Sequence, residues 1–265
     1  MDNRPIGVFD SGIGGLTVVG AMAKTLPQES ILYVGDTARV PYGNKSEERI
    51  QTFSKEITEW LINQNCKMIV VACNTASSLA LAYLKSNFDL PIIGVIAPGV
   101  QSAITATKNH QIGVLGTHAT IRSDAYGKRL LAVNGEISVV SQACPLFVPL
   151  AEEGWVSGDV PESVAKNYLS SIIGSSVDTV ILGCTHYPLL KPVISDVLGE
   201  NVQLVDSGQA TATAVHAVLE KKNLLADETP GEIQCFATDS PESFEALAGR
   251  FLKATISSIQ HIDIS

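Results

Sequence analysis

Short apolar runs rich in β-branched residues alternate along the chain with longer stretches of helical periodicity. We predict eight strands, at residues 6–9, 31–34, 68–72, 92–95, 112–115, 137–140, 179–182 and 202–205. Their residues are continuously apolar, which is typical of parallel strands that helices cover on both faces. Strand–helix alternation of this kind predicts an α/β fold with parallel sheets.

Five of the stretches between or after these runs are predicted to be helices. In residues 46–63, Ile50, Phe53, Ile57 and Leu61 recur at helical spacing. The other predicted helices are residues 76–86, 161–173, 210–222 and 240–254.

Three segments of the first half of the chain recur in the second half in the same order. Residues 6–12 match 112–118, residues 31–34 match 137–140, and residues 70–75 match 181–186. This order indicates an internal duplication, and therefore two similar α/β domains. A chance likeness among apolar strands is the alternative, because strand composition is restricted in all proteins.

Charge and apolar patterning exclude several classes of protein. The 265 residues include 18 Lys and Arg against 27 Asp and Glu, which gives a formal net charge of −9. This balance argues against nucleic acid as a partner, because binding to phosphates requires clustered basic side chains. We find no signal-peptide pattern, and the longest apolar runs are too short to span a bilayer. We therefore expect a cytoplasmic protein with no membrane partner.

Five cysteines occur, and no two of them form a CxxC pair: Cys66, Cys73, Cys144, Cys184 and Cys235. Their spacing excludes the usual zinc ribbon, a thioredoxin-type redox motif and a disulfide scaffold. We expect reduced thiols that bind no metal. A thiol of this kind is either a small core residue or a reactive group, and apolar neighbours favour the core for Cys66, Cys144 and Cys235.

A glycine-rich turn follows the first predicted strand and begins with Asp10 and Ser11. It lacks the GxGxxG spacing of a dinucleotide loop and the Lys of a P-loop. Its backbone N–H groups can bind a small carboxylate, and Asp10 can accept a proton or an ammonium group. The alternative is a tight turn that Asp10 and Ser11 cap.

Cys73 and Cys184 differ from the other cysteines because each follows a buried strand and precedes polar side chains. At the start of a following helix, the positive end of the dipole lowers the pKa of a thiol. His186 is close enough in sequence to exchange a proton with Cys184, although a lone histidine is more often a cap or a surface residue. One thiol in each half fits inversion of a stereocentre, in which one base removes the α-proton and the other group reprotonates the opposite face.

Five segments together resemble the signatures of bacterial glutamate racemases, in the aspartate/glutamate racemase family. They are residues 9–17, 33–37 with 40–43, 72–77, 149–154 and 183–188. The resemblance implies a cofactor-independent interconversion of L- and D-glutamate, without pyridoxal phosphate, that supplies D-glutamate for peptidoglycan. It also implies that the active site lies between the two domains.

The resemblance assigns roles to individual residues. Cys73 would take the proton from D-glutamate and Cys184 from L-glutamate, with Asp10 and His186 assisting. The substrate's charged groups would be bound by Asp10, Ser11, Tyr42, Gly43, Asn74, Thr75, Thr185 and His186. Glu152 is a further candidate, and a solvated charge at a helix end is the alternative for it.

The family organisation implies an inserted second domain. The first domain would comprise residues 1–97 plus 208–265, and the second residues 98–207. A homodimer is also the family expectation.

Two other functions remain open at this point. One is a related two-cysteine racemase that acts on aspartate or a hydantoin, because side-chain length cannot be read from motif spacing. The other is a non-catalytic two-domain protein that binds a small anion, which would need neither thiol to ionise.

Overall fold

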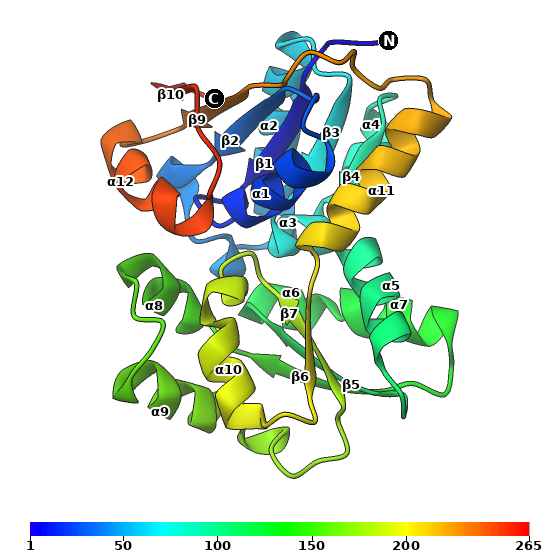
Figure 1. Ribbon diagram of the computed structural model, residues 1–265, viewed down its shortest axis with the longest axis vertical. Helices are drawn as coiled ribbons and strands as arrows, with labels where there is room; N and C mark the ends of the chain where they lie inside the picture. Colours follow the sequence, from blue (N-terminus) through cyan, green and yellow to red (C-terminus); the bar gives the residue numbers. More distant parts are fainter. Residues whose placement is uncertain (265) are drawn as a thin grey trace.

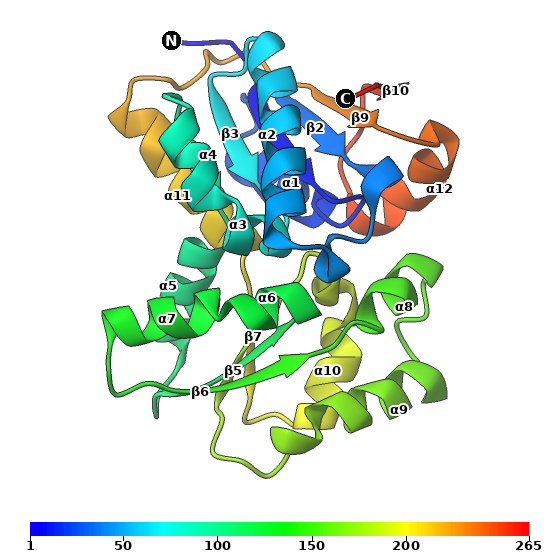
Figure 2. The same ribbon diagram turned by 180° about the vertical axis from the view of Figure 1, so that it is seen from behind.

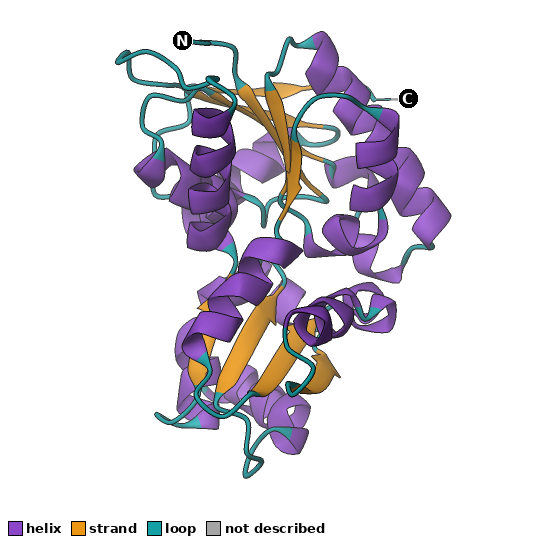
Figure 3. Cartoon of the chain, turned by 90° about the vertical axis from the view of Figure 1, so that its right-hand side faces the viewer, coloured by secondary structure: helices purple, strands orange, loops and turns teal. Residues whose placement is uncertain are grey.

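Two parallel sheets organise the computed structural model, which describes residues 1–264. The larger sheet contains β1 (Ile6–Asp10), β2 (Ile31–Gly35), β3 (Met68–Val71), β4 (Ile92–Gly94), β9 (Ile233–Ala237) and β10 (Ser258–His261). The smaller sheet contains β5 (Gln111–Gly116), β6 (Ser138–Ala143), β7 (Thr179–Gly183) and β8 (Gln203–Asp206). Figure 3 shows the two sheets one above the other, with helices around both. The predicted parallel α/β fold is confirmed.

Helices cover both faces of each sheet, as the continuously apolar strands require. The helices are α1 (Leu16–Thr25), α2 (Glu47–Asn63), α3 (Asn74–Leu79), α4 (Leu81–Asn87), α5 (Ile96–Ala106), α6 (His118–Ser123), α7 (Ala125–Val133), α8 (Phe147–Glu153), α9 (Asp159–Tyr168), α10 (Lys191–Leu198), α11 (Gly208–Lys221) and α12 (Pro241–Phe251). Helices α1, α11 and α12 lie on one face of the larger sheet (Figure 1), and α2, α3 and α4 lie on the other (Figure 2). We call the larger sheet with these six helices the first lobe, and the smaller sheet with α5–α10 the second lobe.

The strand order repeats between the lobes. The larger sheet has the order β10-β9-β2-β1-β3-β4 and the smaller sheet the order β6-β5-β7-β8, so β2-β1-β3-β4 recurs as β6-β5-β7-β8. Val8 pairs with Val70 in the first lobe, and Val114 pairs with Ile181 in the second. These are the pairs that two of the three sequence matches predict.

The third sequence match is displaced by two residues. Ile31 pairs with Ile6, whereas the residue that pairs with Ile112 is Val139, so Ile31 is equivalent to Val139 and not to Ile137. A shift of two residues keeps every side chain on the same face of a strand. The same residues would therefore be buried in both registers, and the apolar pattern alone does not distinguish them.

Other departures from prediction lie in short or weakly patterned segments. Predicted helix 76–86 is two helices, α3 and α4, that meet at Ala80, and predicted helix 161–173 begins at Asp159 and ends in a 3₁₀ turn, Leu169–Ser171. Strands β9 and β10 were not predicted, because they follow the last sequence match and β10 is short, with the polar sequence SIQH. Both join the first lobe, and the proposed domain boundaries at 97/98 and 207/208 remain a prediction.

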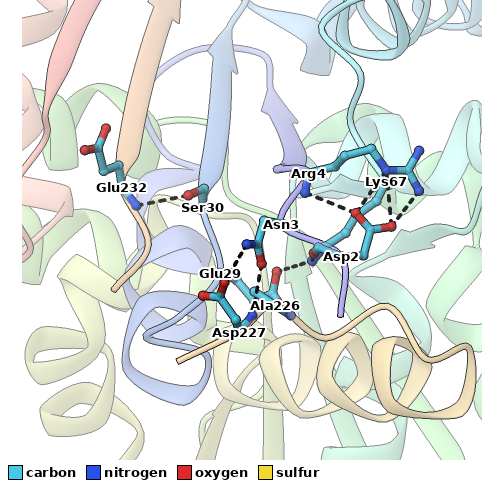
Figure 4. A network of polar contacts seen from close by, with 9 residues as sticks. All are labelled: Asp2, Asn3, Arg4, Glu29, Ser30, Lys67, Ala226, Asp227 and Glu232. Atoms are coloured by element: carbon cyan, nitrogen blue, oxygen red, sulfur yellow. Dashed lines mark hydrogen bonds and ion pairs between the residues drawn. The ribbon is translucent and has the colours of Figure 1, made fainter. Parts of the chain in front are cut away.

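A buried ion pair joins three distant segments at the amino ends of the strands in the first lobe (Figure 4). Lys67 Nζ lies 2.5 Å from Glu29 Oε2 and donates to the carbonyl of Asp2 at 2.5 Å, and both charged side chains are at most 2% exposed. Glu29 Oε1 accepts from the N–H of Ala226 at 2.8 Å. The pair thus links the N-terminus to the segment that leads into β9. In residues 1–264, no helix is long and apolar enough to cross a membrane.

Candidate active site

The loops at the carboxyl ends of both sheets meet between the lobes. Thr185, after β7, lies 3.2 Å from Asp10 at the end of β1, measured from Oγ1 to Oδ2. Thr75, after β3, lies 2.9 Å from Thr117, after β5, measured between hydroxyl oxygens. Ligands of parallel α/β sheets bind outside this end of the strands, so the interface between the lobes is the candidate site.

Asp10 is a buried carboxylate in the glycine-rich turn. Its Oδ2 accepts from the N–H of Gly15 at 2.5 Å, which is the capping arrangement of the alternative interpretation. Its Oδ1 is also buried but finds no hydrogen-bond partner among residues 1–264. Ser11 follows it in the same turn and is half-buried. The turn thus leaves one acceptor oxygen available to a ligand.

The glycines of this turn allow the lobes to approach closely. A Cβ at Gly14 would lie 2.4 Å from Nδ1 of His186 and 2.4 Å from Oγ1 of Thr185. Gly43, in the 3₁₀ turn Tyr42–Asn44, has a similar position, because a Cβ there would lie 2.9 Å from Cβ of Thr117. Both positions are therefore contact points between the two lobes.

Cys73 is buried directly after β3 and caps α3. Its Sγ accepts from the N–H of Ala76 at 3.5 Å, as expected for a thiol at a helix start. However, burial and the nearby charge of Asp10 raise the pKa of Cys73 well above its usual value. The expectation of a lowered pKa is wrong for this thiol, because desolvation outweighs the hydrogen bond from a helix of only six residues.

Cys184 has a different environment. It is followed by the 3₁₀ turn Tyr187–Leu190, and α10 begins only at Lys191, so this thiol does not lie at the start of an α-helix as expected. Instead, Cys184 Sγ lies 3.9 Å from Nδ1 of His186. The predicted proximity of these two residues is confirmed.

His186 is held between Cys184 and Glu152. Its Nε2 lies 2.9 Å from Oε1 of Glu152, near the end of α8, and its ring packs edge-on against Phe251 of α12, with 5.2 Å between the ring centres. Burial lowers the pKa of His186, but the hydrogen bonds to Cys184 and Glu152 and the charges of Cys184 and Asp10 raise it to about 10. His186 therefore carries a proton at neutral pH.

Asn74 and Thr75 bond to side chains of the second lobe. Asn74 Oδ1 accepts from the hydroxyl of Tyr126 at 2.6 Å. Its Nδ2 is buried and, within the described chain, has no hydrogen-bond partner. The Thr75 hydroxyl lies 2.9 Å from that of Thr117 and 3.3 Å from that of Thr120.

Thr117 and Thr120 were missed by the sequence reasoning. The repeat contained a signal for Thr117, since the match of 6–12 with 112–118 aligns it with Ser11. Thr120 carries no such signal, because its position in the site follows from α6, which was not predicted.

Tyr42 stays a predicted substrate contact, and its hydroxyl is bound within the first lobe. Its hydroxyl donates to Asp36, and the same carboxylate accepts from Thr238 at 2.9 Å and from Arg39 Nε at 2.7 and 2.9 Å. Burial and the charge of Asp36 raise the pKa of Tyr42 far above its usual range, so it stays a donor. Tyr42 therefore holds the turn that carries Gly43.

Comparisons with known proteins identify the family of the chain. The sequence model of the Asp/Glu/hydantoin racemase family matches residues 6–215. The chain belongs to this family. It is 47% identical over 262 residues to a glutamate racemase from Geobacter metallireducens, covering 98% of this chain and 97% of that protein.

Solved structures of other family members are similar over the whole chain. A glutamate racemase isoform from Bacillus anthracis has a TM-score of 0.93 and 40% identity, covering 100% of this chain and 99% of that one. A glutamate racemase from Francisella tularensis, solved in complex with D-glutamate, has the same TM-score, identity and coverage. The chain is therefore an enzyme of the racemase class, an isomerase.

The three remaining cysteines of this racemase-family chain lie outside the site residues. Cys66, Cys144 and Cys235 are buried and unpaired with other cysteines, and burial raises the pKa of Cys66 and of Cys235 to about 12. They are core residues, as predicted. Residues 1–264 contain no group of three or more His, Cys, Asp or Glu side chains that could hold a metal ion.

Proposed function

We propose that this enzyme interconverts L- and D-glutamate without a cofactor, with Cys73 and Cys184 as its two proton-transferring groups. The observation that carries the proposal is their equivalence: each buried thiol follows the third strand of its repeat, β3 or β7, at the interface of the lobes. The glutamate racemases among its relatives support glutamate as the substrate.

The surroundings of the thiols differ in a way that suits this chemistry. Burial and Asp10 favour the neutral thiol at Cys73. At Cys184, a protonated His186 places a positive charge 3.9 Å from the sulfur, and Glu152 balances that charge on the other side. We infer that Cys184, with the imidazolium of His186 beside it, is the group that accepts the α-proton of L-glutamate. Cys73 then donates its proton to the opposite face of the carbanion, and D-glutamate reacts in the reverse direction.

Two buried polar atoms of the site have no hydrogen-bond partner in residues 1–264, and they suit the ammonium and carboxylate groups of an amino acid. Asp10 Oδ1 is a buried acceptor for the substrate ammonium, and Asn74 Nδ2 is a buried donor for a carboxylate. The hydroxyls of Thr75, Thr117 and Thr120 form a cluster that can bind the second carboxylate. Ser11, Tyr42, Gly43 and Thr185 complete the proposed substrate contacts, whereas Glu152 acts through His186.

We further propose the setting that the resemblance implies. The enzyme would act in the cytoplasm as a homodimer and supply D-glutamate for peptidoglycan. The second lobe would be the inserted domain of residues 98–207.

Circular dichroism tests the activity and the substrate together. We expect the dichroism signal of L-glutamate and that of D-glutamate to decay, with the same kcat/KM in both directions. The signal of L-aspartate or of a hydantoin should change little. Cys73→Ser and Cys184→Ser should each abolish racemisation while glutamate binding, measured by calorimetry, is retained. Turnover of aspartate alone would contradict the substrate, and racemisation by either variant at the native rate would contradict the role of that thiol.

A further inference from the structure

Tyr126 lies at the interface of the two lobes and contacts a residue adjacent to each of the two thiols. It lies on α7 and is 2% exposed. Its ring packs against two glycines of the second lobe: a Cβ at Gly183 would lie 3.1 Å from Cε2, and one at Gly99 would lie 3.4 Å from Cε1. Gly183 directly precedes Cys184, so the ring is seated beneath the strand end that carries this thiol.

The hydroxyl of Tyr126 reaches into the other lobe. It donates to Oδ1 of Asn74 at 2.6 Å, and Asn74 directly follows Cys73. An amide has two chemically different ends, and a hydroxyl donor selects the oxygen. We propose that Tyr126 is a positioning residue that orients the Asn74 amide, so that Nδ2 is presented to a substrate carboxylate only when the lobes are together.

The state of the buried groups supports this assignment. Burial raises the pKa of Tyr126 above its usual value, so the phenol keeps its proton and stays a donor. Asn74 is 3% exposed, and Nδ2 has no hydrogen-bond partner in the described part of the chain. A buried donor without a partner is costly, which is explained if a ligand carboxylate supplies the acceptor.

The inference rests on the proposed function, because it takes glutamate as the ligand of Asn74. Its test therefore measures glutamate binding by calorimetry as well as racemisation. If the native protein binds glutamate but does not racemise it, the proposed activity fails while the binding data still decide the role of Tyr126.

A double-mutant cycle separates positioning from a general structural role. We expect Tyr126→Phe to weaken glutamate binding and raise KM by roughly three- to tenfold with a smaller change in kcat, because a hydrogen bond that orients one amide is lost. Asn74→Ala should weaken binding further. Adding Tyr126→Phe to Asn74→Ala should then have no additional effect, since no amide remains to be oriented. Tyr168→Phe, which removes a hydroxyl that bonds only to the N–H of Leu146 in residues 1–264, is the control and should bind glutamate as the native protein does.

Two results would overturn the proposal. One is native affinity in Tyr126→Phe, and the other is an effect of Tyr126→Phe that is equally large in the presence and absence of Asn74. Should Tyr126→Phe fail to fold, Asn74→Asp keeps an oxygen for the phenol and removes the amide donor. This variant should fold and lose at least about tenfold in glutamate affinity, and native affinity would again contradict the proposal.

Discussion

Replacing Glu152 by Gln removes one charge from the Cys184–His186–Glu152 chain and leaves its shape unchanged. The amide still reaches Nε2 of His186, which now lies 2.9 Å from Glu152 Oε1. The variant therefore isolates the electrostatic contribution of the carboxylate to the protonation of His186.

The size of the effect follows from the distance and the exposure. Two unit charges 2.9 Å apart attract by about 1.4 kcal/mol in bulk water and by about 6 kcal/mol at an effective dielectric constant of 20. The Glu152 side chain is 39% exposed, so solvent screening favours the lower end, about 1–2 kcal/mol. This corresponds to roughly one pKa unit. The pKa of His186 should fall from about 10 to roughly 9.

The direction of the change in the pKa of His186 determines which limb of the pH profile moves. His186 is charged below its pKa, so lowering the pKa removes the imidazolium from the alkaline side. We expect native kcat/KM in Glu152→Gln at pH 7 and an earlier decline above about pH 8. The titration of the substrate amino group is the same for both proteins and cancels in their ratio.

Nuclear magnetic resonance of the His186 ring, with labelled histidine, measures the pKa directly. Glu153→Gln is the matched control, because Glu153 is the exposed next residue of the same helix. It should leave both the titration and the pH profile unchanged. An unchanged or raised pKa of His186 in Glu152→Gln would refute the electrostatic reasoning.

Two further substitutions test the packing. Lys67→Met should lower the free energy of unfolding by about 3–5 kcal/mol in urea titrations, because it leaves the Glu29 carboxylate buried without its cation; a loss below 1 kcal/mol would contradict a buried pair. Gly14→Ala should reduce kcat/KM at least about 100-fold, because its methyl group would displace His186 and Thr185. Gly249→Ala on α12, where a Cβ meets no described residue within 4 Å beyond its own turn of helix, should racemise as the native enzyme does.

The strands and the two thiols could be predicted from the sequence because each is a local pattern that occurs in both halves of the chain. The repeat alone aligned Cys73 with Cys184, and the strand pairing of Val8 with Val70 and of Val114 with Ile181 agrees with it. A buried strand that ends in a cysteine is visible without knowledge of the rest of the molecule.

The features that were not predicted depend on contacts between distant segments. Cys73 is buried in an apolar cluster built from separate segments of the first lobe, so the local helix start gave the wrong direction for its pKa. The hydroxyl of Tyr42 is bound by Asp36 together with Thr238, a residue far along the chain. The Tyr126–Asn74 bond likewise joins two lobes, and no spacing within one motif indicates it.

Deuterium incorporation tests the two-thiol account most directly. L-glutamate is incubated with the enzyme in D₂O, and both enantiomers are recovered at low conversion and examined by mass spectrometry. We predict that D-glutamate carries deuterium at Cα while the recovered L-glutamate retains protium, because the proton is taken by Cys184 and a different one is delivered by Cys73. Deuterium in recovered L-glutamate at the rate of product formation, or protium retained in D-glutamate, would indicate a single base and contradict the account.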